Sequence, residues 1–407
     1  MNKILYPEKE EWTKILARPE SRGEDLDKVC KAVFDEVKRD GDKALQKYTW
    51  YFDRVRLERF EVTEEEFQEA DSLVEVELKE AIRVARKNIE AFHELQMPEK
   101  CEYVNESGFR CWQEAKAIDR VGLYVPGGSA PLFSTVLMLV VPAKLAGCQE
   151  ITICTPPGKD GRVNPAILWT ARLCGVTRVF KVGGIQAIAA LALGTESVGQ
   201  VGKIFGPGNR FVMAAKQWVG RYGVAIDMPA GPSELMVVAD KSANPAFVAA
   251  DLLSQAEHGP DSQVFLVTCD ECLMDDVEKE LSKQLARIPR KTIAEVALRN
   301  SKYIVLRSRE ECVELVNRYA PEHLMLCVED YSGWIPNVRN AGSVFLGHYS
   351  PESAGDYASG TNHTLPTSGY ARAYSGVNMD AFMKKITFQE ITPEGLAYLG
   401  KTIETVS

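Results

Sequence analysis

Short apolar stretches alternate with helix-like segments along most of the chain beyond residue 120. The stretches carry the aliphatic and β-branched residues of buried strands, and glycine or proline follows most of them. The strands expected from this pattern are 120–125, 150–157, 178–184, 202–205, 224–227, 234–240 and 263–268. Strands joined by helices run parallel, and two such runs follow one another, so we expect an α/β fold with two Rossmann-like parallel-sheet domains.

The first third of the chain is expected to be mainly helical. Thr63 and Glu66 form a capping box, and a stripe of apolar residues follows at helical spacing. The stripe comprises Leu78, Ile82, Ala85, Ile89 and Phe92. It predicts a long amphipathic helix packed on a core, with His93 beside the stripe as a surface histidine without a chemical role.

Composition excludes several classes of function. With 407 residues, 45% of them hydrophobic and 26% charged, the chain is an ordinary globular protein with room for two cores. Its net charge of -9 gives no overall positive potential that would attract nucleic acid or an anionic membrane. The N-terminus reaches Pro7 and charged residues before any long apolar run, and no later run has membrane-spanning length. We therefore expect a cytoplasmic protein that binds neither nucleic acid nor membrane.

The ten cysteines are scattered along the chain, and several lie in apolar runs, namely Cys148, Cys154, Cys174 and Cys327. This distribution favours buried free thiols over a disulfide framework. Cys269 and Cys272 form a CxxC pair, but a second pair that would complete a zinc site is missing from the sequence. We interpret the pair as part of a solvated turn.

Three glycine-rich turns follow expected strands. They are PGGSAP after Tyr124, GGIQ with Gly183 and Gly184, and FGPGN with Gly206 and Gly208. In open α/β sheets ligands bind at the carboxyl ends of strands, so these turns are candidates for a dinucleotide site. None completes the G-x-G-x-x-G pattern, because Phe211 stands where the third turn needs its last glycine. Taken singly, each turn fits an ordinary tight turn as well as it fits a phosphate cradle.

Candidate metal donors lie on the helix expected after Asn244. Asp251, Gln255 and His258 are spaced by four and three residues, which places them on one narrow arc of a helix. On its own this arc is more typical of a solvated polar face.

Further donors lie in the segment 350–371, a long loop that carries Asp356 and His363 and is almost without aliphatic residues. A loop of this length and chemistry indicates a binding loop.

Glu322 and His323 stand between Pro321 and an apolar strand-like run. A carboxylate next to an imidazole at the mouth of a buried strand suits proton transfer near neutral pH. The pair is therefore a candidate catalytic acid and base.

These segments together resemble the signature blocks of the histidinol dehydrogenase family. The matching blocks include VGLYVPGGSAPLFSTVLMLVVPAKLAG, GGIQAIAALALGTESV, KIFGPGNRFV, IDMPAGPSELMVVAD, LLSQAEHGPDSQ, YAPEHL and SAGDYASGTNHTLPT. They occur in the family's order and cover about residues 110 to 380. The resemblance is far more specific than any single motif.

The resemblance implies a zinc-dependent, NAD-linked enzyme and assigns roles to individual residues. The implied zinc ligands are Gln255, His258 and Asp356. The implied NAD contacts are Tyr124, Gln186 and Asn209. Glu322 and His323 correspond to the catalytic acid/base pair, and the implied substrate contacts are Ser233, His323, His363 and the three metal-site residues.

The implied reaction oxidises L-histidinol to L-histidine in two NAD-dependent hydride transfers through L-histidinaldehyde. Zinc would orient the substrate, His323 would take the hydroxyl proton, and Glu322 would activate the water that hydrates the aldehyde. A homodimer with shared active sites also follows from the resemblance.

The expected architecture divides the chain into four parts. A short N-terminal segment covers residues 1–20, and the first Rossmann-like domain combines 21–123 with 233–377 and carries the metal and catalytic residues. The NAD-contacting domain, 124–232, is inserted into it. A C-terminal tail begins at 378.

In the family pattern a further helix follows the region that ends here at Ser407, and it bears a substrate-contacting glutamate and the last zinc-ligand histidine. From the resemblance we expect weakened metal binding and low activity in the 407-residue form. Two alternatives stay open: a relative that oxidises another small alcohol, and a low-activity or non-catalytic NAD-binding form.

Overall fold

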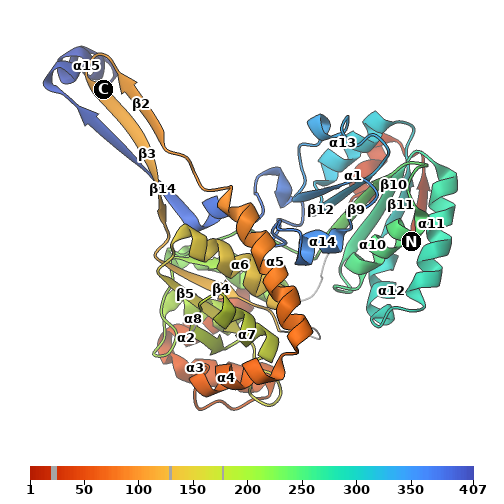
Figure 1. The fold of residues 1–407 in the computed structure, drawn as a ribbon, viewed down its shortest axis with the longest axis horizontal. Helices are drawn as coiled ribbons and strands as arrows, with labels where there is room; N and C mark the ends of the chain where they lie inside the picture. The colour runs from red at the N-terminus through yellow and green to blue at the C-terminus, as the bar shows by residue number, and fades with distance from the viewer. Residues whose placement is uncertain (20–24, 128–130, 177) are drawn as a thin grey trace.

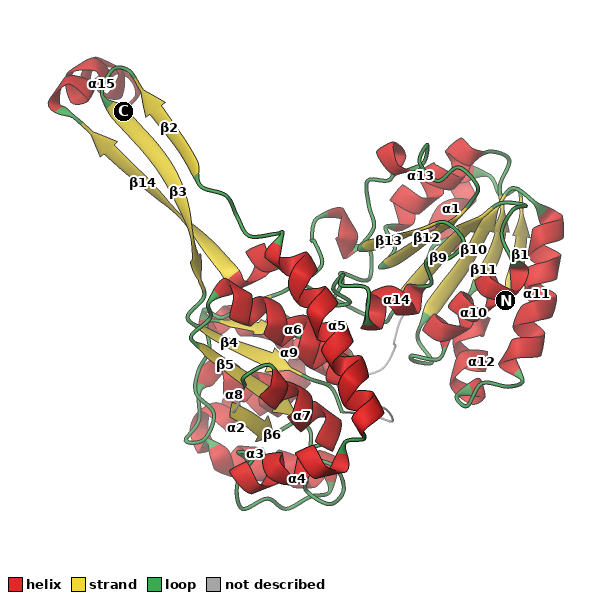
Figure 2. Ribbon diagram, in the orientation of Figure 1, coloured by secondary structure: helices red, strands yellow, loops and turns green. Residues whose placement is uncertain are grey.

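The computed structural model describes residues 1–19, 25–127, 131–176 and 178–407. Two α/β bodies, each built on a parallel sheet, lie side by side, and an arm of antiparallel strands extends from one of them (Figures 1 and 2). The expected α/β fold with two Rossmann-like parallel sheets is confirmed.

The first body holds a six-stranded parallel sheet in the order β1-β11-β10-β9-β12-β13. Its strands are β1 (Asn2–Leu5), β9 (Glu234–Ala239), β10 (Gln263–Thr268), β11 (Lys302–Val305), β12 (His323–Cys327) and β13 (Ser343–Leu346). Its helices are α1 (Trp12–Ile15), α10 (Pro245–Ala256), α11 (Glu271–Leu285), α12 (Lys291–Arg299), α13 (Arg309–Tyr319) and α14 (Glu352–Tyr357). Helices α10, α11 and α12 cover one face, and α1 with α13 covers the other.

The second body holds a five-stranded parallel sheet in the order β6-β5-β4-β7-β8. Its strands are β4 (Arg120–Tyr124), β5 (Glu150–Thr155), β6 (Arg178–Lys181), β7 (Lys203–Phe205) and β8 (Ala225–Ile226). Its helices are α2 (Leu26–Asp40), α3 (Asp42–Asp53), α4 (Glu64–Leu73), α5 (Val76–Glu94), α6 (Phe133–Ala146), α7 (Pro165–Leu173), α8 (Gly184–Leu193) and α9 (Arg210–Trp218).

The two sheets share one topology. In the five-stranded sheet the first strand along the chain, β4, lies at the centre, with β5 and β6 to one side and β7 and β8 to the other. In the six-stranded sheet β9 has β10 and β11 to one side and β12 and β13 to the other, and β1 is added at the edge beside β11. All these strands are parallel, and the side on which new strands are added switches between β4 and β7, and again between β9 and β12. Ligand crevices of open α/β folds lie at such switch points.

The packing of the early helices differs from the sequence-based division that joined 21–123 to the six-stranded sheet. Phe34 of α2 shares a buried cluster with Ile188 of α8, and Ile82 of α5 shares another with Val140 of α6. Helices α2 to α5 therefore cover the five-stranded sheet. Helical periodicity identifies which face of a helix is apolar, but it does not say which of two sheets that face covers.

The arm is a three-stranded antiparallel sheet in the order β14-β3-β2. Its strands are β2 (Cys101–Asn105), β3 (Phe109–Ala117) and β14 (Met383–Ile391), and the helix α15 (Pro393–Val406) lies at its tip (Figure 1). The C-terminal tail expected from 378 is present, and its strand β14 adds a pairing with β3 that was not expected. Short 3-10 helices occur at Lys9–Glu11, Val219–Tyr222, Ile335–Asn337, Tyr370–Arg372 and Met379–Phe382.

Several local expectations hold, and one is wrong. Thr63 and Glu66 form the capping box of α4, and Ile82 and Ile89 are buried on α5. His93 was expected on the surface, but its side chain is 0% exposed and its Nδ1 lies 2.7 Å from the Ile89 carbonyl oxygen. It follows Ile89 by four residues, which puts it on the buried face, whereas Phe92 turns outward.

The cysteines expected to be buried free thiols are buried and unpaired. Cys269 and Cys272 are exposed, as expected, but only Cys269 lies in the bend after β10, because Cys272 belongs to the first turn of α11. Within the described ranges, no helix has both the length and the apolar character needed to cross a bilayer.

Candidate active site

Glu322 and His323 lie at the amino edge of the six-stranded sheet. His323 is the first residue of β12, and the neighbouring strand β9 begins at Glu234. The backbone N–H of Glu234 donates to Oε2 of Glu322 at 2.8 Å, and the backbone carbonyl oxygen of Glu234 lies 3.2 Å from Nδ1 of His323. One residue of the central strand thus holds both members of the expected acid/base pair. The contact at Nδ1 leaves Nε2 of the imidazole as the atom that faces the site.

Two carboxylates of α14 approach that nitrogen. Nε2 of His323 lies 3.3 Å from Oδ1 of Asp356 and 3.9 Å from Oε1 of Glu352. All three side chains are buried, and one ligand atom from each lies within 4.8 Å of the others, so the cluster could hold a cation. Glu352 was missed by the sequence analysis, although it precedes Asp356 by four residues and therefore shares its helix face.

The charges of this cluster shift its protonation equilibria. Burial opposes protonation of His323, but the charge of Glu322 and the close contacts with Asp356 and Glu322 outweigh it and raise the pKa of His323 well above its ordinary value. Burial, and next the charge of Asp356, raise the pKa of Glu352 to about 8. Burial also acts on Asp356, but the contact with His323 prevails and holds the pKa of that carboxyl well below its usual range.

Gln255 and His258 come from the end of α10. The amide nitrogen Nε2 of Gln255 lies 3.4 Å from Nδ1 of His258, and its Oε1 is buried without a hydrogen-bond partner in the described parts of the chain. Asp251, the third donor proposed on this arc, is engaged differently, because its Oδ1 accepts from the backbone N–H of Glu352 at 3.2 Å. That bond ties α10 to α14, the helix that carries Asp356.

An unsatisfied buried amide oxygen costs about 1–3 kcal/mol unless something binds it. Gln255 Oε1, His323 Nε2 and Glu352 Oε1 are all buried atoms that lack a hydrogen-bond partner among the described residues. Amide, imidazole and carboxylate donors are a set that zinc accepts. The residues present therefore fit a metal ion between α10 and α14.

His363 connects this cluster to the other body. Its Nδ1 lies 2.8 Å from the carbonyl oxygen of Asp356, and its Nε2 lies 3.1 Å from Oγ1 of Thr135, near the start of α6. Burial lowers the pKa of His363. Since α6 follows the turn after β4, this contact places the amino edge of the six-stranded sheet against the carboxyl edge of the five-stranded one. Ser233 directly precedes β9 and is partly buried.

The expected cofactor residues lie at the carboxyl edge of the five-stranded sheet. The hydroxyl of Tyr124, the last residue of β4, accepts from the backbone N–H of Gly184 at 3.1 Å, which joins the first turn to the second. Asn209 caps α9 by accepting from the N–H groups of Phe211 and Val212. Residues 128–130 of the PGGSAP turn lie outside the described part.

Gln186 is the strongest sign of a ligand at this edge. Its side chain is 0% exposed, yet both Oε1 and Nε2 lack a hydrogen-bond partner within the described ranges. A buried amide with four unused hydrogen-bonding positions is costly in a folded protein without a bound polar group. It lies in the first turn of α8, two residues after Gly184, whose N–H bonds the Tyr124 hydroxyl, and this position fits a dinucleotide at this edge.

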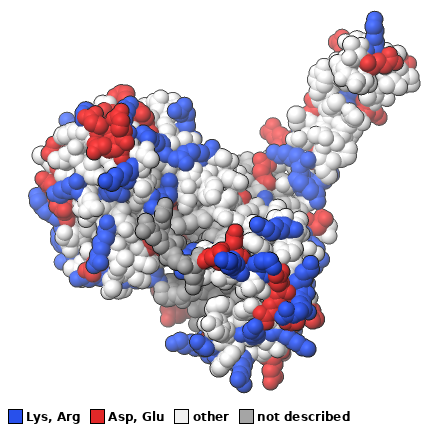
Figure 3. Space-filling model, turned by 180° about the vertical axis from the view of Figure 1, so that it is seen from behind, with Lys and Arg blue, Asp and Glu red and all other residues white. Residues whose placement is uncertain are grey.

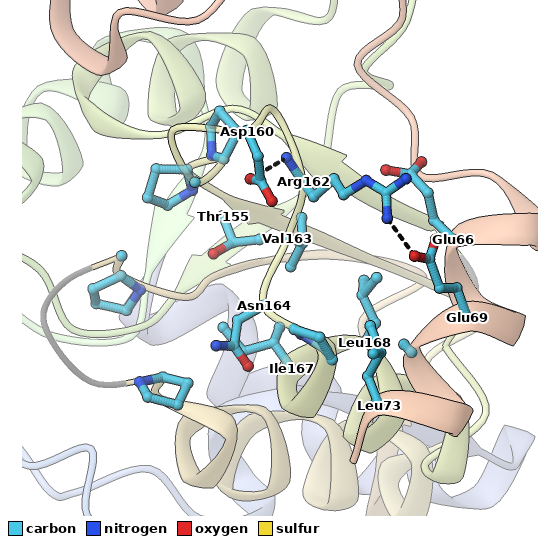
Figure 4. Close-up of a pocket in the computed structure, with 18 residues that line it drawn as sticks. Glu66, Glu69, Leu73, Thr155, Asp160, Arg162, Val163, Asn164, Ile167 and Leu168 are labelled. Carbon is cyan, nitrogen blue, oxygen red and sulfur yellow. Dashed lines mark hydrogen bonds and ion pairs between the residues drawn. The ribbon is translucent and has the colours of Figure 1, made fainter.

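A cavity of about 420 Å³ opens beside the same edge. Figure 4 shows Thr155, at the end of β5, and Asn164, at the start of α7, among its lining residues. Arg162 closes one side, where its guanidinium donates to Glu69 at 2.6 Å and its backbone N–H to Asp160 at 3.1 Å. The cavity is wide enough for part of a cofactor.

Comparison with known proteins supplies an independent finding. A family model described as histidinol dehydrogenase matches residues 16–407. The chain is 56% identical over 407 residues to the histidinol dehydrogenase of Bacteroides thetaiotaomicron, which covers 100% of this chain and 95% of the relative. A crystal structure of histidinol dehydrogenase from Elizabethkingia anophelis has a TM-score of 0.98 at 53% identity and covers 100% of this chain and 94% of that one.

A more distant likeness concerns the fold alone. The crystal structure of an acetylating aldehyde dehydrogenase from Geobacillus thermoglucosidasius has a TM-score of 0.52 at 13% identity, with 94% of each chain covered.

Proposed function

The chain belongs to the histidinol dehydrogenase family and is an oxidoreductase that converts histidinol to histidine, and we propose that it does so with Zn²⁺ and NAD held by the residues described above. The observation that carries the proposal is the placement of His323, whose Nδ1 contacts a strand carbonyl while its Nε2 faces Asp356 at 3.3 Å. An imidazole oriented in this way can take a proton at a defined atom.

Gln255, His258 and Asp356 would hold the metal. When bound, Zn²⁺ orients the imidazole and amine of the substrate. Asp356 contributes a carboxyl that stays ionised, because its contact with His323 keeps its pKa low. Glu352 lines the same space and keeps α14 close to α10, because its Oε2 accepts a hydrogen bond from the Ser254 hydroxyl at 2.8 Å.

Tyr124, Gln186 and Asn209 would contact NAD. When bound, NAD accepts the hydride that leaves the carbinol carbon. The unsatisfied amide of Gln186 supplies a donor and an acceptor for a polar group of the cofactor. Tyr124 fixes the backbone at Gly184, which keeps the second turn open toward the first.

His323 would take the hydroxyl proton of the alcohol at Nε2 as oxidation proceeds. Glu322, held by the N–H of Glu234, would accept a proton from the water that adds to the aldehyde. His363 and Ser233 would contact the substrate. The contact of His363 with Thr135 keeps the catalytic edge against the cofactor edge, which orients the reacting groups.

We also propose a homodimer in which the arm packs on a second copy of the chain. Helix α15 at the tip of the arm exposes apolar side chains, with Leu396 56%, Tyr398 63% and Val406 80% exposed. Figure 3 shows uncharged residues over much of the arm, although both signs of charge are interspersed over the rest of that face. Exposed apolar surface of this kind is typical of a protein–protein interface.

The test is NAD reduction by the purified chain with added Zn²⁺ and L-histidinol, followed by identification of the product as L-histidine. Other small primary alcohols at the same concentration serve as controls. Turnover of another alcohol, but not of histidinol, would contradict the proposal.

Light scattering over a range of concentrations tests the dimer separately, and a monomer at micromolar concentration would refute it.

A further inference from the structure

Lys216 and Asp227 form a buried ion pair in the cofactor body. Lys216 lies on α9, and Asp227 directly follows β8. Nζ of Lys216 lies 2.5 Å from Oδ1 of Asp227, and the two side chains are 1% and 0% exposed. Taking two charges out of water is costly, so such a pair persists only where further hydrogen bonds complete it.

Those hydrogen bonds go mainly to a single residue, Gly206. Nζ of Lys216 donates to the Gly206 carbonyl oxygen at 2.7 Å, and the Gly206 N–H donates to Oδ2 of Asp227 at 2.8 Å. Asp227 also accepts from the backbone N–H of Met228 at 2.7 Å. The ion pair therefore binds both backbone polar groups of the first glycine in the FGPGN turn.

The position of Gly206 is restricted on its other side by Tyr124. Gly206 has a φ of +119°, and a Cβ built there would lie 2.1 Å from the Tyr124 carbonyl oxygen. The turn therefore touches the backbone of one proposed cofactor residue and ends at another, Asn209. β4 and β7 are neighbours at the switch point, where open α/β sheets bind ligands. The Lys216–Asp227 ion pair therefore lies next to the expected ligand crevice.

We propose that Lys216 and Asp227 are positioning residues for the dinucleotide. By clamping Gly206 from both sides, they set the distance between Tyr124 and Asn209 across the crevice. The inference rests on the proposed NAD site and adds to it two residues that touch neither cofactor nor substrate.

A purely structural role would leave a different signature. If the pair only joins α9 to β8, replacing both charges with apolar groups of similar size should restore stability and leave cofactor affinity unchanged. If the pair positions the turn, the same double substitution restores stability but not the geometry of Gly206. In the double variant a positioning role therefore predicts restored stability with weakened cofactor affinity, whereas a purely structural role predicts that both are restored.

The experiment compares Lys216→Met with the double variant Lys216→Met/Asp227→Leu. We expect Lys216→Met to lose stability, because it leaves a buried carboxylate unpaired, and the double variant to regain most of the thermal stability. In both, KM for NAD rises about 10- to 100-fold, since misplacement by about 1 Å costs that much. KM for histidinol and zinc content stay within about twofold of wild type.

Lys203→Met is the matched control. Lys203 lies on β7, the strand that leads into the same turn, but its Nζ donates to the Ala381 carbonyl oxygen at 2.7 Å. Its loss should lower stability without changing KM for NAD.

A double variant with wild-type KM for NAD would overturn the inference. Failure of both variants to fold would also overturn it, because the pair would then be a requirement of the fold. If instead the wild-type chain does not reduce NAD with histidinol, while the wild type and the Lys216 variant bind NAD with different affinities by calorimetry, the proposed function fails and the positioning role stands.

Discussion

Nε2 of His363 lies 3.1 Å from Oγ1 of Thr135, so a side chain from the catalytic loop contacts a helix of the cofactor body. Replacing Thr135 with valine keeps the shape of the side chain and removes this contact. We expect kcat to fall about fivefold to tenfold, which corresponds to one hydrogen bond of about 1 kcal/mol. Steady-state kinetics with zinc content measured in parallel check this.

Thr170→Val is the control for that substitution. Thr170 is equally buried, but its Oγ1 donates to the Ala166 carbonyl oxygen within α7. Its replacement should leave kcat unchanged. An unchanged kcat in Thr135→Val would mean that the His363–Thr135 contact does not position the catalytic edge of one sheet against the cofactor edge of the other.

Substitution of His323 tests the proposed proton transfer. His323→Gln removes the group whose Nε2 faces Asp356, so we expect kcat to fall about 100- to 10,000-fold, the range contributed by a positioned acid or base. His348→Gln, at a histidine whose Nε2 contacts Ser242 outside the site, should retain activity. Equal losses in the two variants would argue against a special role for His323.

The proposed metal site predicts a loss of zinc on changing Asp356. Asp356→Ala removes a carboxylate that stays ionised, and we expect zinc affinity to fall at least about 10- to 100-fold. Metal analysis of dialysed protein measures it directly, without reliance on turnover. Asp240→Ala, which changes a carboxylate bound to Ser242, controls for the loss of one negative charge. Stoichiometric zinc in the Asp356 variant would exclude this residue as a ligand.

Gln186 offers a test in which stability and function should move in opposite directions. In Gln186→Leu, a buried amide that has no partner in the described structure is replaced by an apolar group, so the free energy of unfolding should stay the same or rise by about 1 kcal/mol. KM for NAD should rise about tenfold or more, because a cofactor contact is lost.

The contrast for that variant is Gln263→Leu. The amide of Gln263 donates to the carbonyl oxygens of Ala17 and Asn300, both at 3.1 Å, and accepts from the Tyr319 hydroxyl at 2.8 Å. Its loss should therefore destabilise the fold. Equal destabilisation of the two variants would contradict this prediction, because it would mean that the Gln186 amide makes hydrogen bonds within the protein, as the Gln263 amide does.

Asp53 predicts a pH-dependent stability. Burial raises the pKa of this carboxyl to about 6, above its unfolded value of about 4. The protonated form is therefore favoured on folding, and its contribution to stability is full below about pH 4 and is lost as the pH rises through about 6. A shift of this size corresponds to about 3 kcal/mol, and partial exposure of the side chain reduces the expectation to about 1 kcal/mol.

Asp53→Asn should then be more stable than wild type by about 1 kcal/mol near pH 8, with the difference vanishing near pH 4. Denaturant unfolding at both pH values measures it. Asp119→Asn, at an exposed carboxylate, should show no such difference. A constant difference across this range would mean that the Asp53 carboxyl does not titrate differently on folding.

The sequence predicted features that depend on neighbouring residues. The parallel strands, the capping box at Thr63 and the helix start at Asn244 are local patterns, and the structure contains each of them. Asn209 was expected to serve the cofactor, and the structure adds that it caps α9. The resemblance to one family named the acid/base pair, whose bonds to Glu234 became visible only in the fold.

Features that depend on distant pairing escaped prediction. The partner of β3 is β14, with Ala117 opposite Met383, and no local pattern links these segments. Glu352 could not be predicted for the same reason, because its place in the cluster depends on His323, which lies on a different element of the fold. The Lys216–Asp227 pair likewise joins a helix to a strand end, and only the fold shows that both side chains meet at Gly206.

The arm has a consequence for the order in which the protein can fold. Strand β3 is made early, but its longest partner begins only at Met383, after both α/β bodies have been synthesised. Until then the hairpin of β2 and β3 presents an unpaired edge, which is a site for wrong pairing between nascent chains. Contacts so distant along the chain also form slowly. Maturation of the arm is therefore expected to be the late step, after each sheet has assembled around its own central strand.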